Sequence, residues 1–255
     1  MRSSVLRVLA GHSLRRRLGG WRFLGALALA ALPGLQLILT WRFGDDVELF
    51  PIYRSYVVPL CLYFLTPFAT MLTMLPVVGE LYESGAVGYL YTRPTPRWAS
   101  LLGLYLGAEA ALVLVLAFGA FAPALFGLTV EPGGDWLRVA FGLWAALALG
   151  GLAYGALCLF LGVWSRRAIL WALFVLVFWG AALGSLPGSL RSWSLHHYLF
   201  GLVRHWCDVE DAFSGMFPPI DSPPGVLRSV LVLLAAAAVG LGLTSALAER
   251  KDVAA

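Results

Sequence analysis

Charge is scarce in this sequence. Of its 255 residues only 13% are Asp, Glu, Lys or Arg, whereas 60% are hydrophobic. Soluble domains carry about 25% charged residues, because water must solvate their surface. A chain with half that fraction cannot cover itself in this way, and its mean hydropathy of +0.82 indicates that lipid is its main solvent. The composition therefore excludes an ordinary soluble domain and predicts a polytopic membrane protein.

Lysine and cysteine are nearly absent as well. Lys251 is the only lysine, and a P-loop requires a lysine directly after its glycine-rich turn, so this chain cannot bind ATP by that route. The three cysteines (Cys61, Cys158 and Cys207) are an odd number without CxxC spacing, which excludes a disulfide framework. HExxH and GxSxG motifs are also missing, which argues against an intramembrane protease or a lipid-modifying enzyme.

Six apolar runs are long enough to cross a membrane, so we expect an all-α membrane protein with six transmembrane helices. The runs cover residues 23–40, 56–78, 98–129, 137–164, 168–186 and 226–248. With the N-terminus inside, twelve of the 18 Lys and Arg residues lie in inner segments and six in outer ones, while nine acids lie outside and four inside. The positive-inside rule therefore predicts that both termini are cytoplasmic, and the net charge of +4 reflects this face rather than nucleic-acid binding.

The first 22 residues are basic and partly apolar but too short to span. We expect an amphipathic interfacial helix over residues 1–22, followed by a transmembrane domain over 23–255. A disordered basic tail is the alternative. A signal peptide is a second alternative, because Arg15–Arg17 precede an apolar run. Against it, Trp21 and Trp41 bracket that run at about 30 Å, one hydrocarbon thickness.

The inner segment 79–97 has an unusual order of residues. Glu80 and Glu83 stand one helical turn apart near its start, where a helix N-terminus favours negative charge. Gly85 allows a turn, and Arg93-Pro94-Thr-Pro-Arg97 then ends the helix. This pattern predicts a short docking helix at the cytoplasmic surface. A well-capped connecting loop is the alternative.

The same segment resembles the corresponding part of ABC-2-type ABC transporter permeases. In that family a glutamate–glycine segment after the second span leads to a Leu-x-x-Arg-Pro-x-x-Arg stretch and then to the third span. The matching positions are Glu80, Glu83, Gly85, Leu90, Arg93, Pro94, Arg97, Leu101, Leu102 and Gly103. Ala86 stands where the family often has threonine. The layout also agrees, with a basic helix before span one and a short charged C-terminal tail.

The resemblance implies a permease subunit of an ATP-driven exporter in the bacterial inner membrane, not an enzyme in its own right. ATP and Mg²⁺ would be bound by a separate ABC ATPase present in two copies, and this chain would hold no cofactor. A second permease copy, most simply in a homodimer, would complete the transporter. Residues Glu80, Glu83, Gly85, Arg93, Pro94 and Arg97 would then couple the permease to the ATPase. The layout does not identify the substrate.

Polar residues within the spans are candidates for a substrate path. Glu109 lies about 18 Å along span three, near the bilayer centre, where an ionised acid costs about 2.5–3.5 kcal/mol. It either contacts substrate or protons, or is a protonated acid bonded to a neighbouring helix. Thr66, Thr70 and Thr73 share one face of span two. They either contact substrate or repair backbone hydrogen bonds lost to nearby prolines.

The outer segment 187–225 contains the remaining candidates. His196, His197, His205 and Cys207 could ligate copper or zinc if they fold together. The alternative is a re-entrant or interfacial hairpin rich in aromatic residues. A membrane enzyme or metalloenzyme-assembly factor that uses Glu109 and these residues is the second functional hypothesis.

Overall fold

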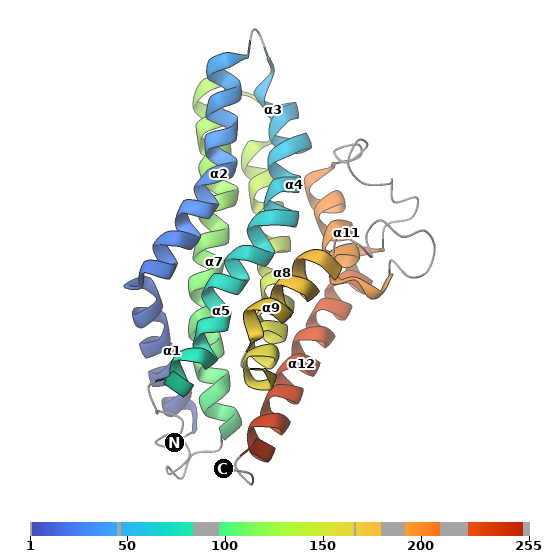
Figure 1. Ribbon diagram of the computed structural model, residues 1–255. Helices are drawn as coiled ribbons and strands as arrows, with labels where there is room; N and C mark the ends of the chain where they lie inside the picture. The colour runs from blue at the N-terminus through green and yellow to red at the C-terminus, as the bar shows by residue number, and fades with distance from the viewer. Residues whose placement is uncertain are drawn as a thin grey trace.

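The computed structural model describes residues 2–44, 47–83, 97–165, 167–179, 192–209 and 224–251, and these form helices joined by short connections (Figure 1). In chain order the elements are α1 (Arg2–Leu18), α2 (Trp21–Phe43), α3 (Leu49–Ile52), η1 (Tyr53–Val57), α4 (Val58–Leu60), η2 (Cys61–Leu65), α5 (Thr66–Glu83), α7 (Arg97–Val130), α8 (Trp136–Trp164), α9 (Ala168–Ala172), η3 (Leu173–Trp179), α11 (Leu195–Cys207) and α12 (Val226–Lys251).

Five helical stretches are long and apolar enough to cross a membrane, which confirms the predicted all-α, multi-pass class. They cover Trp21–Phe43, Leu49–Gly79, Trp98–Val130, Trp136–Trp164 and Val226–Arg250. The other predicted span, 168–186, begins with α9 and η3, and its remainder lies outside the described residues. With 34 residues, α7 is about 51 Å long, well beyond a hydrocarbon layer of about 30 Å.

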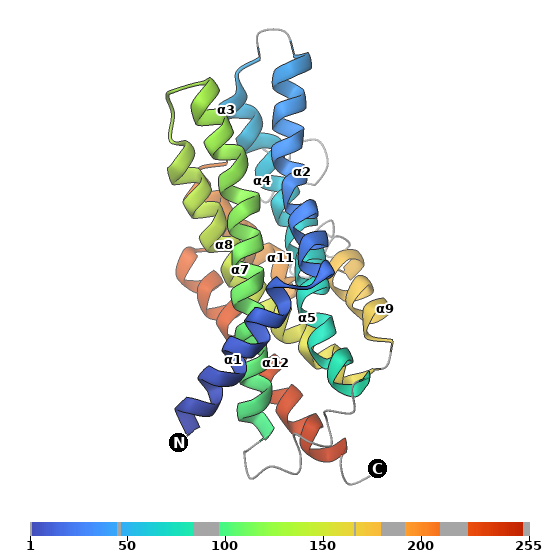
Figure 2. The same cartoon turned by 90° about the vertical axis from the view of Figure 1, so that its left-hand side faces the viewer.

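Helix α1 packs along the first turns of α7 (Figure 2). The hydroxyl of Ser13 donates a hydrogen bond to the carbonyl oxygen of Leu104 at 3.0 Å. A Cβ placed on Gly107 would lie 2.6 Å from the Cβ of Ser13, so the two backbones approach closely only because residue 107 has no side chain. The sequence predicted a helix here, and the structure adds that one face of this helix is covered by protein.

Helix α2 follows α1 after a break at Gly19 and Gly20, and continues along the same α7 (Figure 2). Trp41 near its end meets the ring of Phe126 edge-on, with 5.8 Å between ring centroids. The α1–α2 pair therefore accompanies α7 over most of its length.

The second span is one helical rod made of α3, η1, α4, η2 and α5. It contains two π-helical segments and four prolines, among them Pro59 and Pro67. It begins seven residues before the predicted run of 56–78, and the carboxylate of Glu131 accepts a hydrogen bond at 3.0 Å from the N–H of Leu49 at its first turn. Tyr53 anchors the rod to α7 by donating a hydrogen bond to the carbonyl oxygen of Ala120 at 2.9 Å.

We predict that Gly107→Ala will displace α1 and destabilise the protein by about 1–3 kcal/mol, because the new methyl group overpacks the α1–α7 contact. Thermal unfolding of the purified protein in detergent measures the effect. Gly25→Ala is the matched control, since a Cβ on Gly25 of α2 would meet no atom within 4 Å. Equal unfolding midpoints for the two variants would contradict the packing described here.

Candidate functional site

The carboxyl group of Glu109 lies inside the bundle, between α7 and α8. The residue is only 5% exposed, and neither of its oxygens has a hydrogen-bond partner among the described residues. A Cβ on Gly151 would lie 3.0 Å from one oxygen, and a Cβ on Gly155 would lie 3.0 Å from the other. Two glycines one turn apart on α8 therefore make the space that this carboxyl group occupies.

Two larger side chains line the same space. The methyl group of Met74, from α5, would lie 3.0 Å from a Cβ on Gly155, and the ring of Tyr105 would lie 3.3 Å from it. The Tyr105 hydroxyl donates a hydrogen bond to the carbonyl oxygen of Leu152 at 2.7 Å. The Glu109 site thus joins three spans and contains one acid with unused hydrogen-bonding capacity. A buried acid of this kind can accept, hold and release a proton, or bind a polar group that enters the bundle.

Packing along α7 places Glu109 relative to the first two helices. The turns of α7 just before Glu109 pack against α1, where Gly107 meets Ala10 and Leu14. Ala30 of α2, by contrast, packs against Gly119 of α7. Glu109 therefore lies almost level with the end of α1.

The three threonines of span two are buried and bonded to their own helix. The hydroxyl groups of Thr66, Thr70 and Thr73 donate to the carbonyl oxygens of Cys61, Thr66 and Ala69 at 2.8, 2.7 and 2.8 Å. Of the two interpretations considered above, the geometry therefore favours backbone repair. These hydroxyl groups have no donor left for a substrate.

The segment predicted to couple the protein to a partner is described only at its two ends. Glu80 and Glu83 belong to the last turns of α5, so the prediction that they begin a separate helix is wrong. A glycine inside a helix costs only about 1 kcal/mol, and Gly79 does not end α5. Arg97 begins α7, whereas Gly85, Arg93 and Pro94 lie outside the described residues.

The structure does not gather the four candidate metal ligands of α11. His196 is buried, His205 is exposed, and Cys207 is buried with its thiol 3.5 Å from the carbonyl oxygen of Val139. His197 follows His196 and points about 100° away from it on the helix. Within the described ranges, no three His, Cys, Asp or Glu residues are placed to hold a metal ion.

His196 instead attaches α11 to two spans. One ring nitrogen shares a hydrogen bond with the hydroxyl of Tyr154 in α8, and the ring stacks on Tyr63 in η2 with centroids 4.9 Å apart. Burial lowers the pKa of His196 to about 4, against a smaller opposing effect of the Leu62 backbone. The ring is therefore neutral at physiological pH and acts as a structural contact.

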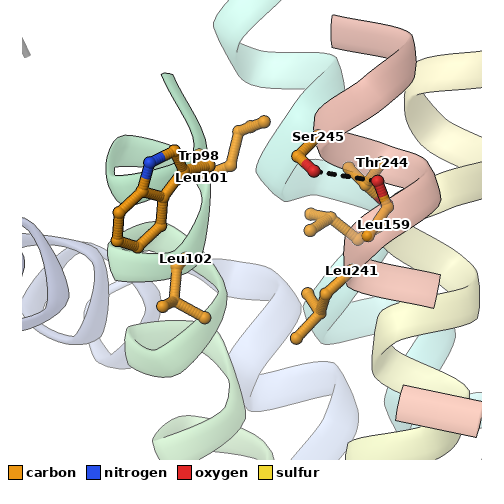
Figure 3. A pocket seen from close by; sticks show the side chains of 8 residues that line it. Trp98, Leu101, Leu102, Leu159, Leu241, Thr244 and Ser245 are labelled. Atoms are coloured by element: carbon orange, nitrogen blue, oxygen red, sulfur yellow. Dashed lines mark hydrogen bonds between the residues drawn. The ribbon is translucent and has the colours of Figure 1, made fainter. Parts of the chain in front are cut away.

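An apolar cavity of about 330 Å³ lies between the first turns of α7 and the last turns of α12 (Figure 3). Trp98 and Leu102 line it from α7, and Leu159 and Leu241 line it from α8 and α12. Among the described residues that line it, Thr244 and Ser245 carry hydroxyl groups, and both donate to carbonyl oxygens of their own helix. The wall therefore offers hydrocarbon rather than hydrogen-bond donors to anything that enters.

No model of a known protein family matches this chain, and no curated protein shows significant similarity to it. The classification therefore comes from the fold and the site. The chain is an all-helical, multi-pass integral membrane protein with five described helices able to cross a bilayer. Its buried Glu109 has no hydrogen-bond partner among the residues that the structure describes.

We predict that Gly155→Ala will destabilise the protein by about 1–3 kcal/mol, and that Glu109→Ala will relieve about 1 kcal/mol of this cost, because the new methyl group is forced against the carboxyl group. Thermal unfolding of both single variants and the double variant gives the coupling energy. Gly242→Ala in α12 is the control, since a Cβ there meets nothing within 4 Å. Strict additivity of the two changes would refute the contact.

Acidification should weaken the attachment of α11. The pKa of His196 is about 4 when folded and about 6.5 when unfolded, so the unfolded chain binds more protons between these values and stability falls as the pH drops. From pH 7 to pH 5 the expected loss is about 2 kcal/mol. His196→Gln should lose less over this interval than the wild type, whereas His205→Gln, at an exposed position, should match the wild type. Identical pH profiles for the wild type and His196→Gln would contradict this assignment.

Proposed function

We propose that this chain is the transmembrane permease subunit of an ATP-binding-cassette exporter of the ABC-2 type. Two copies of a separate ATPase would bind ATP and Mg²⁺, and a second permease copy would complete the transporter. The observation that carries the proposal is where α5 ends and where α7 begins. Span two ends in a helical extension bearing Glu80 and Glu83, and α7 starts with Arg97 at the same end of the bundle (Figure 1).

The position of the two acids supports a docking role. Glu80 and Glu83 follow the apolar stretch of span two, which ends at Gly79. Acidic residues beyond the apolar part of a span are well suited to meet a basic groove on a partner protein by charge complementarity.

The proposed topology has six spans with both termini in the cytoplasm. The beginning of α1, the end of α5, the beginning of α7 and the end of α12 all lie at one end of the bundle in both views (Figures 1 and 2). Arg250 and Lys251 end α12 at this end of the bundle, whereas Arg15, Arg16 and Arg17 lie in the last turn of α1, farther along the bundle. We infer that α9 and η3 begin the fifth of the six crossings and that this end of the bundle faces the cytoplasm of a bacterial cell.

Helix α5 offers a direct path from the partner to the interior. Val78 packs against α8, where a Cβ on Gly162 would lie 3.1 Å from its own Cβ, and Met74 reaches the Glu109 site one turn away. Nucleotide-driven closure of the ATPases would push on the Glu83 end of α5. Because a helix transmits force along its axis, that push would reach the α5–α7–α8 contact and change access to the bundle interior.

We predict that Glu80→Arg with Glu83→Arg will leave the protein inserted and folded but will abolish its co-purification with an ABC ATPase from the native membrane. The double change replaces two negative charges with two positive ones at the docking surface. Affinity purification followed by mass spectrometry identifies the ATPase, and its activity in the reconstituted complex should fall at least tenfold.

Glu48→Arg is the control for this experiment, because Glu48 is exposed at the opposite end of the bundle. It should retain the partner and the activity of the wild type. Retention of the ATPase by the Glu80/Glu83 variant would overturn the coupling role, and the absence of any ATPase from wild-type preparations would overturn the proposed function itself.

A further inference from the structure

A second cavity, of about 310 Å³, lies at the elbow between α1 and α2, on the side that faces α5. Arg16 and Arg17 line it from the last turn of α1, and Arg22 lines it from the first turn of α2. Leu72 and Thr73 of α5 form part of its wall. Three of the chain's 18 basic residues therefore surround one small hollow.

Two structural features of this cavity favour phosphate binding. Guanidinium groups present planar, forked donors that match phosphate oxygens. The 23-residue helix α2 also begins here, and its N-cap residue Gly20 makes no side-chain hydrogen bond to the first turn of the helix. The positive end of a helix and three arginines thus favour the same kind of ligand, an oxyanion.

The surroundings place this hollow where a lipid headgroup would lie. Trp21 is 76% exposed, and the guanidinium carbon of Arg22 lies 5.6 Å from the centre of its ring. Exposed tryptophans paired with arginines are typical of the boundary between headgroups and hydrocarbon. On the α2 side the apolar stretch of the first span starts directly beyond, with the half-buried Phe23 in the cavity wall.

We propose that this elbow pocket binds the phosphate headgroup of an anionic phospholipid from the leaflet at the basic end of the bundle. The arginines and the α2 N-terminus would hold the phosphate, and the acyl chains would run along the exposed apolar face of α2, which includes Leu24 and Leu32. A bound lipid would fix the angle between α1 and α2, which are joined only by Gly19 and Gly20. This inference is independent of the proposed transport function.

The test uses the full-length protein in detergent, titrated with phosphatidylglycerol or phosphatidylcholine and observed by native mass spectrometry. Phosphatidylglycerol should bind at least tenfold more tightly than phosphatidylcholine. Replacing Arg16, Arg17 and Arg22 by Gln should weaken phosphatidylglycerol at least tenfold, since each basic residue near an anionic headgroup contributes about fivefold. The matched control replaces the exposed Arg7, Arg15 and Arg42 by Gln, removes the same charge, and should stay within about twofold of the wild type.

Two results would overturn the proposal. Equal losses in the two triple variants would show attraction to overall charge rather than a site. Displacement of phosphatidylglycerol by excess inorganic phosphate would identify a small-anion site instead of a lipid site. If the pocket variant does not fold, the wild type still provides the test, because a photoactivatable phosphatidylglycerol should label peptides containing residues 16–23 or 72–73. Labelling confined to other peptides would refute the assignment.

Discussion

Close backbone packing is the constraint on which this bundle depends. Lipid tails are as apolar as leucine, so helices in a membrane gain little from burying hydrophobic side chains and associate through van der Waals contact instead. The contact between α7 and α8 shows the consequence. At Gly151 and Gly155 the two helices approach closely, and the Glu109 carboxyl group and the ends of Leu112, Leu116, Met74 and Tyr105 lie against the two glycines. Helices α1, α2 and α5 also contact α7, whereas α9, α11 and α12 pack mainly on α8, so the α7–α8 pair positions most of the described helices.

The second span shows how a backbone with a missing hydrogen bond is accommodated in lipid. Pro67 has no N–H group, so it cannot supply the hydrogen bond that the π-helical register would direct to the carbonyl of Leu62. The hydroxyl of Thr66 donates a hydrogen bond to the carbonyl of Cys61, one residue earlier. In lipid such backbone groups must find partners inside the protein, and here a threonine of the same helix supplies one.

Hydropathy predicted much of the fold because the length of an apolar run along the sequence sets the length of a membrane span. Spans three and four were predicted as 98–129 and 137–164, and the structure has Trp98–Val130 and Trp136–Trp164. Span two was predicted too short, because Pro51 and Arg54 interrupt the apolar run. In the structure the Arg54 side chain lies 3.8 Å from the carboxylate of Asp208, which lets this polar turn belong to the helix. Asp208 is 154 residues away from Arg54 along the chain, so no local sequence pattern predicts this contact.

The candidate sites were less predictable for the same reason. The Gly151/Gly155 spacing and Glu109 are both visible in the sequence, but only the register of α7 against α8 brings them together. The arginines of the elbow belong to the predicted interfacial helix, but no local pattern predicts that α5 forms part of the pocket wall beside them. The shared element in both places is α5. Leu72 and Thr73 face the elbow pocket, Met74 faces the Glu109 site, and Val78 packs on α8. Successive residues of a helix point about 100° apart, so one rigid rod meets both sites within a single turn. A displacement of the Glu83 end of α5 would therefore move the residues that α5 contributes to both sites.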